Sequence, residues 1–263
     1  MGVYPPTEGK LHYAGQPLTV KRRKDRLDFS RRAQMIFQDP HASLNPRKTV
    51  GAIIGEGLDI HGLARGRERL RKIEELLTLV GLQGDMAGRY PHEFSGGQRQ
   101  RIGIARALAL GPEFIVSDEP ISALDVSIQA QIVNLLKRLQ RELDLTHLFI
   151  AHDLNMVRYI SDRVAVMYLG SIVEWADCAD IYTRPLHPYT QGLLSAVPAM
   201  NPGQIQPAGQ ESLKGEIPSP ASVIPGCAFC SRCSQAMPVC ERVKPEPVEA
   251  APGHRVACHL YTS

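Results

Sequence analysis

The chain has 263 residues, enough for one large domain or for one domain with an appendage. Lys and Arg total 30 against 27 Asp and Glu, a balance too even to indicate a nucleic acid as partner. Hydrophobic residues make up 43% and charged residues 22%, which excludes a disordered or fibrous chain. No apolar run reaches the roughly 18 residues of a membrane-spanning helix, and the first residues lack the apolar core of a signal peptide, so we expect a cytoplasmic protein.

Strand-like and helix-like patterns alternate from about residue 33 to residue 197, which predicts an α/β layer fold. The expected elements in chain order are a strand at 33–37, a helix at 67–80, a strand at 114–117, a helix at 124–139, a strand at 147–151 and a hairpin of 163–168 with 171–175 at the sheet edge. Polar residues follow the strands, where an open α/β sheet binds its ligand. We interpret the basic run at 21–26 as a solvated loop, with a phosphate or membrane contact as the alternative.

The composition changes after Val197. Residues 198–226 are rich in proline and lack apolar periodicity, so they predict an extended connector. Most of the six cysteines lie beyond it, at Cys227, Cys230, Cys233, Cys240 and Cys258. In a reducing compartment such clustering favours a metal site over disulfides, and the C-x₂-C-x₂-C spacing is typical of iron–sulfur loops. Zinc and unligated thiols remain open alternatives.

Two motifs carry candidate phosphate chemistry. Residues Ser95, Gly96, Gly97 and Gln98 precede an apolar-periodic helix, whose first N–H groups and positive dipole end can bind a phosphate; a merely capped helix is the alternative. Asp118 and Glu119 end a buried strand, where one carboxylate can hold Mg²⁺ through water and its neighbour can orient an attacking water.

The ordered set of Gln38, Ser95 to Gln98, Asp118-Glu119, Ser122 to Asp125 and His152 resembles the nucleotide-binding subunits of ABC transporters. Longer phrases resemble the ATP-binding subunits of bacterial oligopeptide and dipeptide importers: 37–46, 90–98, 122–131, 187–191 and the cysteine tail. The resemblance implies an incomplete ABC-ATPase nucleotide-binding domain at 1–197, with a RecA-like α/β core and a helical signature subdomain at about 50–112. Residues 198–263 would then be a linker and a cysteine-rich extension.

The resemblance also implies a role for each site residue. Gln38 would couple the γ-phosphate and Mg²⁺ to the membrane subunits, and Asp118 would hold Mg²⁺ through water. Glu119 would be the general base and His152 the switch. Ser95, Gly96, Gly97 and Gln98 would contact a nucleotide of the opposing subunit, and Asp125 would link the two sites. Some members of this group bind a [4Fe-4S] cluster at positions matching Cys227, Cys233, Cys240 and Cys258, whereas Cys230 departs from that pattern.

By this resemblance the chain is a peripheral ATPase subunit at the cytoplasmic face of the cell membrane. Its ligands would be ATP and Mg²⁺, and its partners a second ATPase subunit, two transmembrane permease subunits and an extracellular or periplasmic peptide-binding protein. A soluble ABC-type ATPase and a non-catalytic subunit that donates its signature segment are the alternatives.

One motif of this family is absent from these 263 residues, the phosphate loop G-x-x-x-x-G-K-[ST]. The one Gly-Lys pair, Gly9-Lys10, is followed by Leu11. We therefore expect that the chain begins downstream of the loop, by truncation or by nature, and that it does not hydrolyse ATP alone. We also expect unpaired strand edges and exposed apolar surface.

Overall fold

The computed structural model describes residues 6–18, 22–196, 218–219 and 224–262. The chain packs as two compact units, Met1–His152 and Asp153–Ser263. The domain boundary predicted at residue 197 lies outside the described residues, as does most of the predicted connector. Within the described ranges, no helix is both long enough and apolar enough to cross a membrane.

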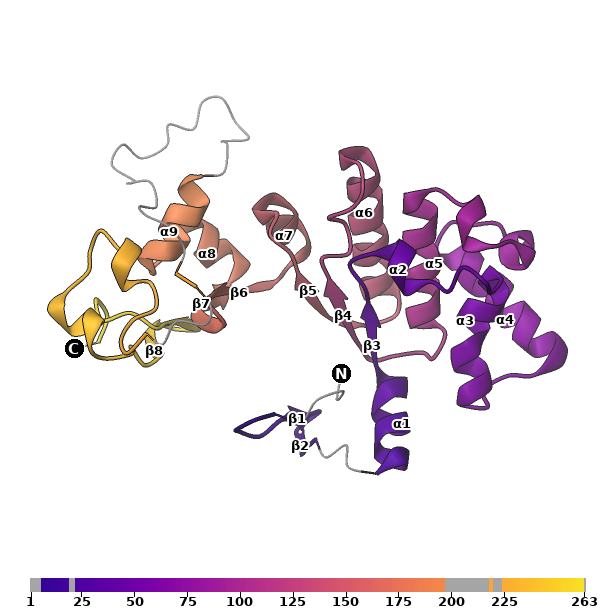
Figure 1. Cartoon of the computed structure of the whole chain (residues 1–263), viewed down its shortest axis with the longest axis horizontal. Coiled ribbons are helices and arrows are strands. Elements are labelled where there is room, and N and C mark those ends of the chain that lie inside the picture. Colours follow the sequence, from indigo (N-terminus) through magenta and orange to yellow (C-terminus); the bar gives the residue numbers. More distant parts are fainter. Residues whose placement is uncertain (1–5, 19–21, 197–217, 220–223, 263) are drawn as a thin grey trace. The chain divides into compact units, whose positions relative to one another are not determined.

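The first unit is built on a three-stranded parallel sheet in the order β3-β4-β5 (Figure 1). These strands are β3 (Ala33–Ile36), β4 (Phe114–Asp118) and β5 (Thr146–Ile150), and they confirm the three predicted strands. Helix α6 (Val126–Glu142) connects β4 to β5, as the predicted helix at 124–139 requires. Because all three strands run in one direction, their carboxyl ends meet at the same sheet edge.

The two faces of this sheet differ in solvent exposure. Ile36, Ile115 and Ser117 are buried on one face of the sheet, and α5 (Gly96–Leu108) packs against β3. On β5 the opposite face carries Leu148, 49% exposed, and Ile150, 44% exposed. In the described part of the chain β5 pairs with β4 alone. Exposed apolar surface was expected, and Leu148 and Ile150 provide it, whereas an edge left by a missing strand stays a prediction.

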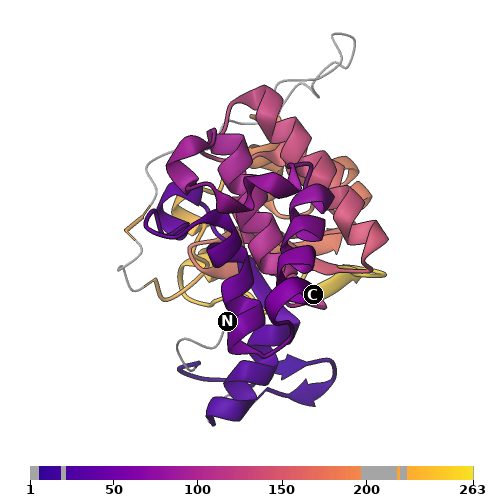
Figure 2. The same ribbon diagram turned by 90° about the vertical axis from the view of Figure 1, so that its right-hand side faces the viewer.

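A group of helices follows β3 and precedes β4 (Figure 2). The short α2 (Pro40–Ser43) leads to α3 (Val50–Ile60), α4 (Gly66–Leu79) and α5, which pack against one another. Two short 3₁₀ turns, at Gly84–Gly88 and Pro91–Glu93, join α4 to α5. The apolar stripe that predicted a helix at 67–80 is confirmed by α4, which buries Ile73 and Leu77.

The basic run is a helix rather than the predicted loop. It opens α1 (Arg23–Arg32), which has no buried residue and follows the small hairpin of β1 (His12–Tyr13) and β2 (Gln16–Pro17). Arg32 at its end donates to both carboxylate oxygens of Glu113. The predicted solvation is therefore confirmed, but the conformation is wrong because the charged residues here have good helix propensity.

The second unit contains an antiparallel sheet in the order β6-β7-β9-β8. Its hairpin of β6 (Arg163–Tyr168) and β7 (Ser171–Asp177) was predicted, but as an edge of the parallel sheet. Instead β7 pairs with β9 (His254–Val256), which pairs with β8 (Val248–Ala251). The hairpin thus pairs with the C-terminal segment. The sequence did not predict this pairing because β8 and β9 lie far along the chain and have no strong alternation of apolar and polar residues.

Three helices complete the second unit, α7 (Leu154–Ile160), α8 (Cys178–Thr183) and α9 (Pro188–Ser195). Short 3₁₀ turns at Cys230–Arg232 and Pro238–Glu241 shape the cysteine segment. A small core of Tyr168, Val173 and Phe229 lies between sheet and cysteine segment, with Cys227 and Cys233 packed against it. Phe229 is the ring common to these contacts, at 5.3 Å from the Tyr168 centroid and 5.4 Å from that of Tyr189.

Candidate functional site

Three predicted site residues meet at the carboxyl edge of the parallel sheet. The Gln38 Nε2 donates to Glu119 Oε2 at 2.8 Å, and His152 Nδ1 lies 3.4 Å from Glu119 Oε1. Each residue follows a different strand: Gln38 comes just after β3, Glu119 directly after β4, and His152 just after β5. Residues far apart in sequence therefore converge on one carboxylate, which we call the Glu119 cluster.

The backbone at Glu119 is held in an unusual conformation. Its φ is +43°, in the left-handed region that costs a side-chain-bearing residue about 1 kcal/mol or more. The Glu119 N–H donates to the Ile150 carbonyl at 2.9 Å, and the Glu119 carbonyl accepts from the Ser122 N–H at 3.2 Å. These bonds fix the turn that directs Glu119 toward Gln38 and His152, while Asp118 ends β4 beside it.

The Glu119 cluster is accessible to solvent. The His152 side chain is 73% exposed and that of Glu119 is 30% exposed. Carboxylate and amide oxygens at a strand end are the ligand types that Mg²⁺ prefers, and a carboxylate open to water can orient or deprotonate that water. The residues present thus fit a magnesium–phosphate site in their donor chemistry.

The predicted phosphate motif begins α5. We call Ser95 to Gln98 the signature turn. Ser95 Oγ accepts from the Gln98 N–H at 3.3 Å, and Gln98 Oε1 accepts from the Ser95 N–H at 3.0 Å, which is a reciprocal capping box. The capped-helix interpretation is therefore correct at this position. The cap leaves the N–H groups of Gly96 and Gly97 without an intrahelical acceptor, so it is compatible with a bound anion.

The segment after Glu119 lies against the signature turn. We call Ser122 to Asp125 the aspartate loop. A Cβ atom added at Gly97 would meet Ile128 Cγ2 at 2.6 Å, and one at Gly96 would meet Leu124 Cδ2 at 3.4 Å. Gly97 is thus required for close packing within this chain, whereas a side chain at Gly96 would make an ordinary van der Waals contact.

The segment after Gln38 is attached to α5 through two arginines. Arg99 contacts the His41 ring and donates to the Pro91 carbonyl at 2.8 Å. Arg106 donates to the Ser43 carbonyl, and its guanidinium lies 5.5 Å from the Phe37 ring centroid. The residues around Gln38 and the signature turn therefore belong to one packed part of the first unit.

A Ser–His pair, with the serine buried and the histidine half-buried, joins two of the strands that end at the site. Ser117 Oγ and His147 Nε2 are 2.7 Å apart, joining β4 to β5 one residue before Asp118. Burial lowers the pKa of His147 to about 4, so the ring is neutral near neutral pH. This pair stabilises the two strands that carry Asp118, Glu119 and His152.

The cysteine segment does not support the predicted metal site. All cysteines are free, and no group of three or more His, Cys, Asp or Glu side chains in the described residues is arranged to hold a metal ion. Burial first, and neighbouring thiols second, raise the pKa of Cys258. Burial likewise raises the pKa values of Cys227, Cys230 and Cys233. The thiols as placed here are not gathered around a metal position, and no chemical step is derived from a cluster.

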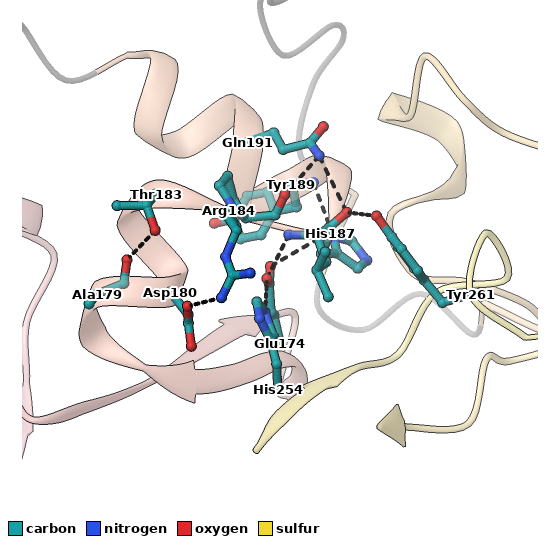
Figure 3. A network of polar contacts seen from close by, with 12 residues as sticks. Glu174, Ala179, Asp180, Thr183, Arg184, His187, Tyr189, Gln191, His254 and Tyr261 are labelled. Carbon is teal, nitrogen blue, oxygen red and sulfur yellow. Dashed lines mark hydrogen bonds and ion pairs between the residues drawn. The ribbon is translucent and has the colours of Figure 1, made fainter. Parts of the chain in front are cut away.

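The second unit contains a polar network that the sequence did not predict (Figure 3). Glu174, with its side chain fully buried, accepts from the Leu186 N–H at 2.7 Å, the His187 N–H at 3.0 Å and His254 Nε2 at 2.7 Å. Tyr261 donates to the Leu186 carbonyl at 3.1 Å. One carboxylate thereby joins β7, the start of α9 and the C-terminal segment.

Sequence reasoning assigned no role to Glu174, His187, His254, Ser117 or His147. A charged residue inside the apolar run of β7 is a signal that could have identified Glu174, since a buried carboxylate needs partners. His187 was noted within a family phrase only. Its Nε2 is buried with no partner among the described residues, and burial lowers the pKa of this ring to about 4.

Comparisons with known proteins agree with this geometry. The family described as "ABC transporter" matches residues 1–122, and "Oligopeptide/dipeptide transporter, C-terminal region" matches residues 173–240. The oligopeptide transport ATP-binding protein AppF of Bacillus subtilis is 56% identical over 261 residues, covering 99% of this chain and 79% of the relative. The oligopeptide transport ATP-binding protein OppF of the same organism is 62% identical over 202 residues, covering 76% of this chain and 66% of the relative.

Two solved structures share the fold. The cbiO1 protein of Clostridium perfringens, part of the ABC transporter complex cbiONQ, superposes with a TM-score of 0.63 at 24% identity, covering 70% of this chain and 71% of that one. The ATP-binding cassette MJ0796, solved as a dimer bound to ADP and Pi, gives 0.58 at 30% identity, covering 66% and 75%. The predicted fold class is thereby confirmed, and the chain belongs to the ABC transporter family, among the oligopeptide and dipeptide transport ATP-binding proteins.

Proposed function

We propose that this chain is the ATP-binding subunit that energises the import of peptides by an ABC transporter. The observation that carries the proposal is the Glu119 cluster, in which Gln38, Glu119 and His152 meet at the carboxyl edge of the sheet. The names of the relatives, oligopeptide transport ATP-binding proteins, supply the substrate class.

Each residue of the cluster takes a distinct role in this proposal. Glu119 accepts a proton from, or orients, the water that attacks the γ-phosphate. Gln38 and His152 hold that carboxylate in place, and Asp118 with Gln38 provides oxygen ligands for Mg²⁺. When bound, Mg²⁺ neutralises charge on the phosphates. With Gln38 on one side and His152 on the other, the Glu119 carboxylate can orient a single water. Such positioning of the attacking water contributes much of the rate of phosphoryl transfer.

The signature turn serves a second subunit in this proposal. It sits at the start of α5, where free N–H groups and the helix dipole favour a phosphate. The solved relative MJ0796 is a dimer holding ADP and Pi. Asp125, which begins α6, would link the two nucleotide sites. A second candidate is a subunit that only donates this turn to its partner.

The other partners follow from the transporter assignment. Two transmembrane permease subunits would contact the segment after Gln38, which the exposed Phe37, at 46%, directly precedes. The chain would then lie at the cytoplasmic face of the membrane as a peripheral protein, and a peptide-binding protein outside would deliver the substrate.

Three measurements of MgATP turnover test the proposal. We compare the full chain alone, a second ATP-binding subunit that contains G-x-x-x-x-G-K-[ST], and a mixture of the two. The mixture is then measured again with Ser95→Arg or Glu119→Gln in this chain. We expect the mixture to exceed the sum of its parts and each variant to lower its turnover by about tenfold or more. Glu75→Gln, on the exposed side of α4, is the matched control.

The outcomes separate the candidates. Dependence on both Ser95 and Glu119 supports the full ATPase subunit, while dependence on Ser95 alone supports the signature-donating subunit. If turnover depends on neither residue, both candidates are excluded.

An iron–sulfur cluster held by Cys227, Cys233, Cys240 and Cys258, or zinc in its place, stays a separate proposal. Its support is the clustering of these thiols in the sequence and the nearness of Cys227, Cys233 and Cys240 to Cys258. Anaerobic purification, absorbance at about 400 nm and metal analysis distinguish iron, zinc and free thiols.

A further inference from the structure

The start of α6 contacts both loops that flank the proposed nucleotide site. Ile128 and Gln129 lie in its first turn and Gln131 in its second, directly after the aspartate loop. Gln129 Nε2 donates to the Ile121 carbonyl and to the Leu124 carbonyl, both at 3.0 Å. One amide therefore bonds a carbonyl just before the aspartate loop and a carbonyl within it, and so holds the loop against α6.

The start of α6 also contacts α5 at and after the signature turn. The van der Waals space that a side chain at Gly97 would need is filled by Ile128, with Cγ2 at 2.6 Å from the added Cβ. Gln131 Oε1 accepts from Arg101 Nη2 at 3.2 Å, and Arg101 also donates to the Val80 carbonyl at 2.7 Å. Ile128 thus contacts the first turn of α5 and Gln131 the second.

The aspartate loop is in turn bonded to the Glu119 turn. The Glu119 carbonyl accepts from the Ser122 N–H at 3.2 Å and from Ser122 Oγ at 3.1 Å. Contacts therefore run without interruption from Glu119 through the aspartate loop and α6 to Gly97. Two segments that act on different nucleotides in the proposed dimer are connected inside one subunit.

We propose that Ile128, Gln129 and Gln131 form a brace that holds the aspartate loop and the signature turn of the same chain at one fixed spacing. These three are positioning residues, because each acts through the backbone or side chains of its neighbours. The brace couples the chain's own nucleotide site to the signature turn that it offers to its partner. The consequence for ATP use rests on the proposed function, whereas the brace itself is a property of the folded chain.

Hydrogen exchange of the full chain, followed by mass spectrometry, tests the brace without nucleotide or partner. In Gln129→Ala we expect exchange to rise by about tenfold in the peptides covering both 121–125 and 95–99. Gln140→Ala, a half-buried glutamine near the other end of α6, is the matched control and should change neither peptide. A rise confined to 121–125 would show that Gln129 only closes its own loop and would overturn the proposal.

A compensating pair of substitutions provides the second test, again measured by hydrogen exchange. Gly97→Ala should raise exchange at 95–99 because the new methyl group collides with Ile128, and Ile128→Ala in the same chain should reverse that rise by making room. Circular dichroism confirms that each variant is folded. If Gly97→Ala has the same effect with and without Ile128→Ala, the contact does not position the signature turn.

The two proposals fail separately. Unchanged exchange in Gln129→Ala refutes the brace even where MgATP turnover of the mixture depends on Ser95 and Glu119. A mixture without turnover refutes the proposed function even where both loops loosen together.

Discussion

Glu119 in the first unit and Glu174 in the second each face a histidine, yet their surroundings are opposite. Glu119 is 30% exposed, and its His152 partner is 73% exposed at 3.4 Å. Glu174 is fully buried and its His254 partner is 4% exposed at 2.7 Å, with two backbone N–H groups completing the shell. The first carboxylate keeps an open side, and the second has none.

The difference in solvent access distinguishes a carboxylate suited to catalysis, Glu119, from one suited to a structural role, Glu174. A carboxylate that meets water can exchange a proton with a substrate, whereas one enclosed by donors is fixed and serves to hold segments together. The same residue pair therefore has two uses, decided by access rather than by residue type. Three predictions test this contrast through the free energy of unfolding.

The largest effect is expected for Glu174→Ala. Removing the carboxylate leaves His254 and the N–H groups of Leu186 and His187 buried without an acceptor, which should destabilise the second unit by about 3–5 kcal/mol. Denaturant unfolding of the full chain measures this. Glu246→Ala, at an exposed position of the same unit, is the control, and an equal small loss in both variants would contradict a structural role for Glu174.

Acid should destabilise both units by a smaller amount. His147 in the first unit and His187 in the second have pKa values lowered to about 4, against an ordinary value of 6.5, so the unfolded chain binds more protons between these limits. The stability from each ring is complete above pH about 6.5 and is lost as pH falls toward 4, up to about 3 kcal/mol per ring.

Melting temperatures measured from pH 7 to pH 4 check this expectation. His147→Phe should flatten the pH dependence, while His12→Gln, at an exposed position, should leave it unchanged. A melting temperature that does not fall across this window would mean that both rings are protonated at no cost in the folded chain.

The smallest effect is expected for Glu119→Gln. Because this side chain is open to water and the amide keeps its shape, stability should change by less than about 0.5 kcal/mol. Denaturant unfolding alongside Glu174→Gln gives the comparison directly. A loss at Glu119 as large as that at Glu174 would remove the distinction drawn between them.

Much of the first unit could be predicted from its sequence because its signals are local. Apolar runs identified β3, β4 and β5, and the residues after them, Gln38, Glu119 and His152, meet because parallel strands share a carboxyl edge. The packing of Gly97 against Ile128 could not be predicted, since it depends on the angle between two helices.

The second unit was harder to predict because its contacts are distant in sequence. Strand β9 pairs with β7 some eighty positions earlier, and the bond of His254 to Glu174 spans the same separation. Neither residue has a motif around it. The family phrase at 187–191 marked the region, but only the fold shows that His187 begins a helix above a buried carboxylate.

The left-handed backbone at Glu119 has a practical consequence for engineering. Glycine or asparagine would adopt φ +43° with less strain, so a screen that rewards heat resistance alone should accept either residue there. Such a thermostable variant would fold well but would lack the Glu119 carboxylate, which is the group proposed to orient the attacking water. Thermostabilisation of this chain should therefore leave position 119 untouched.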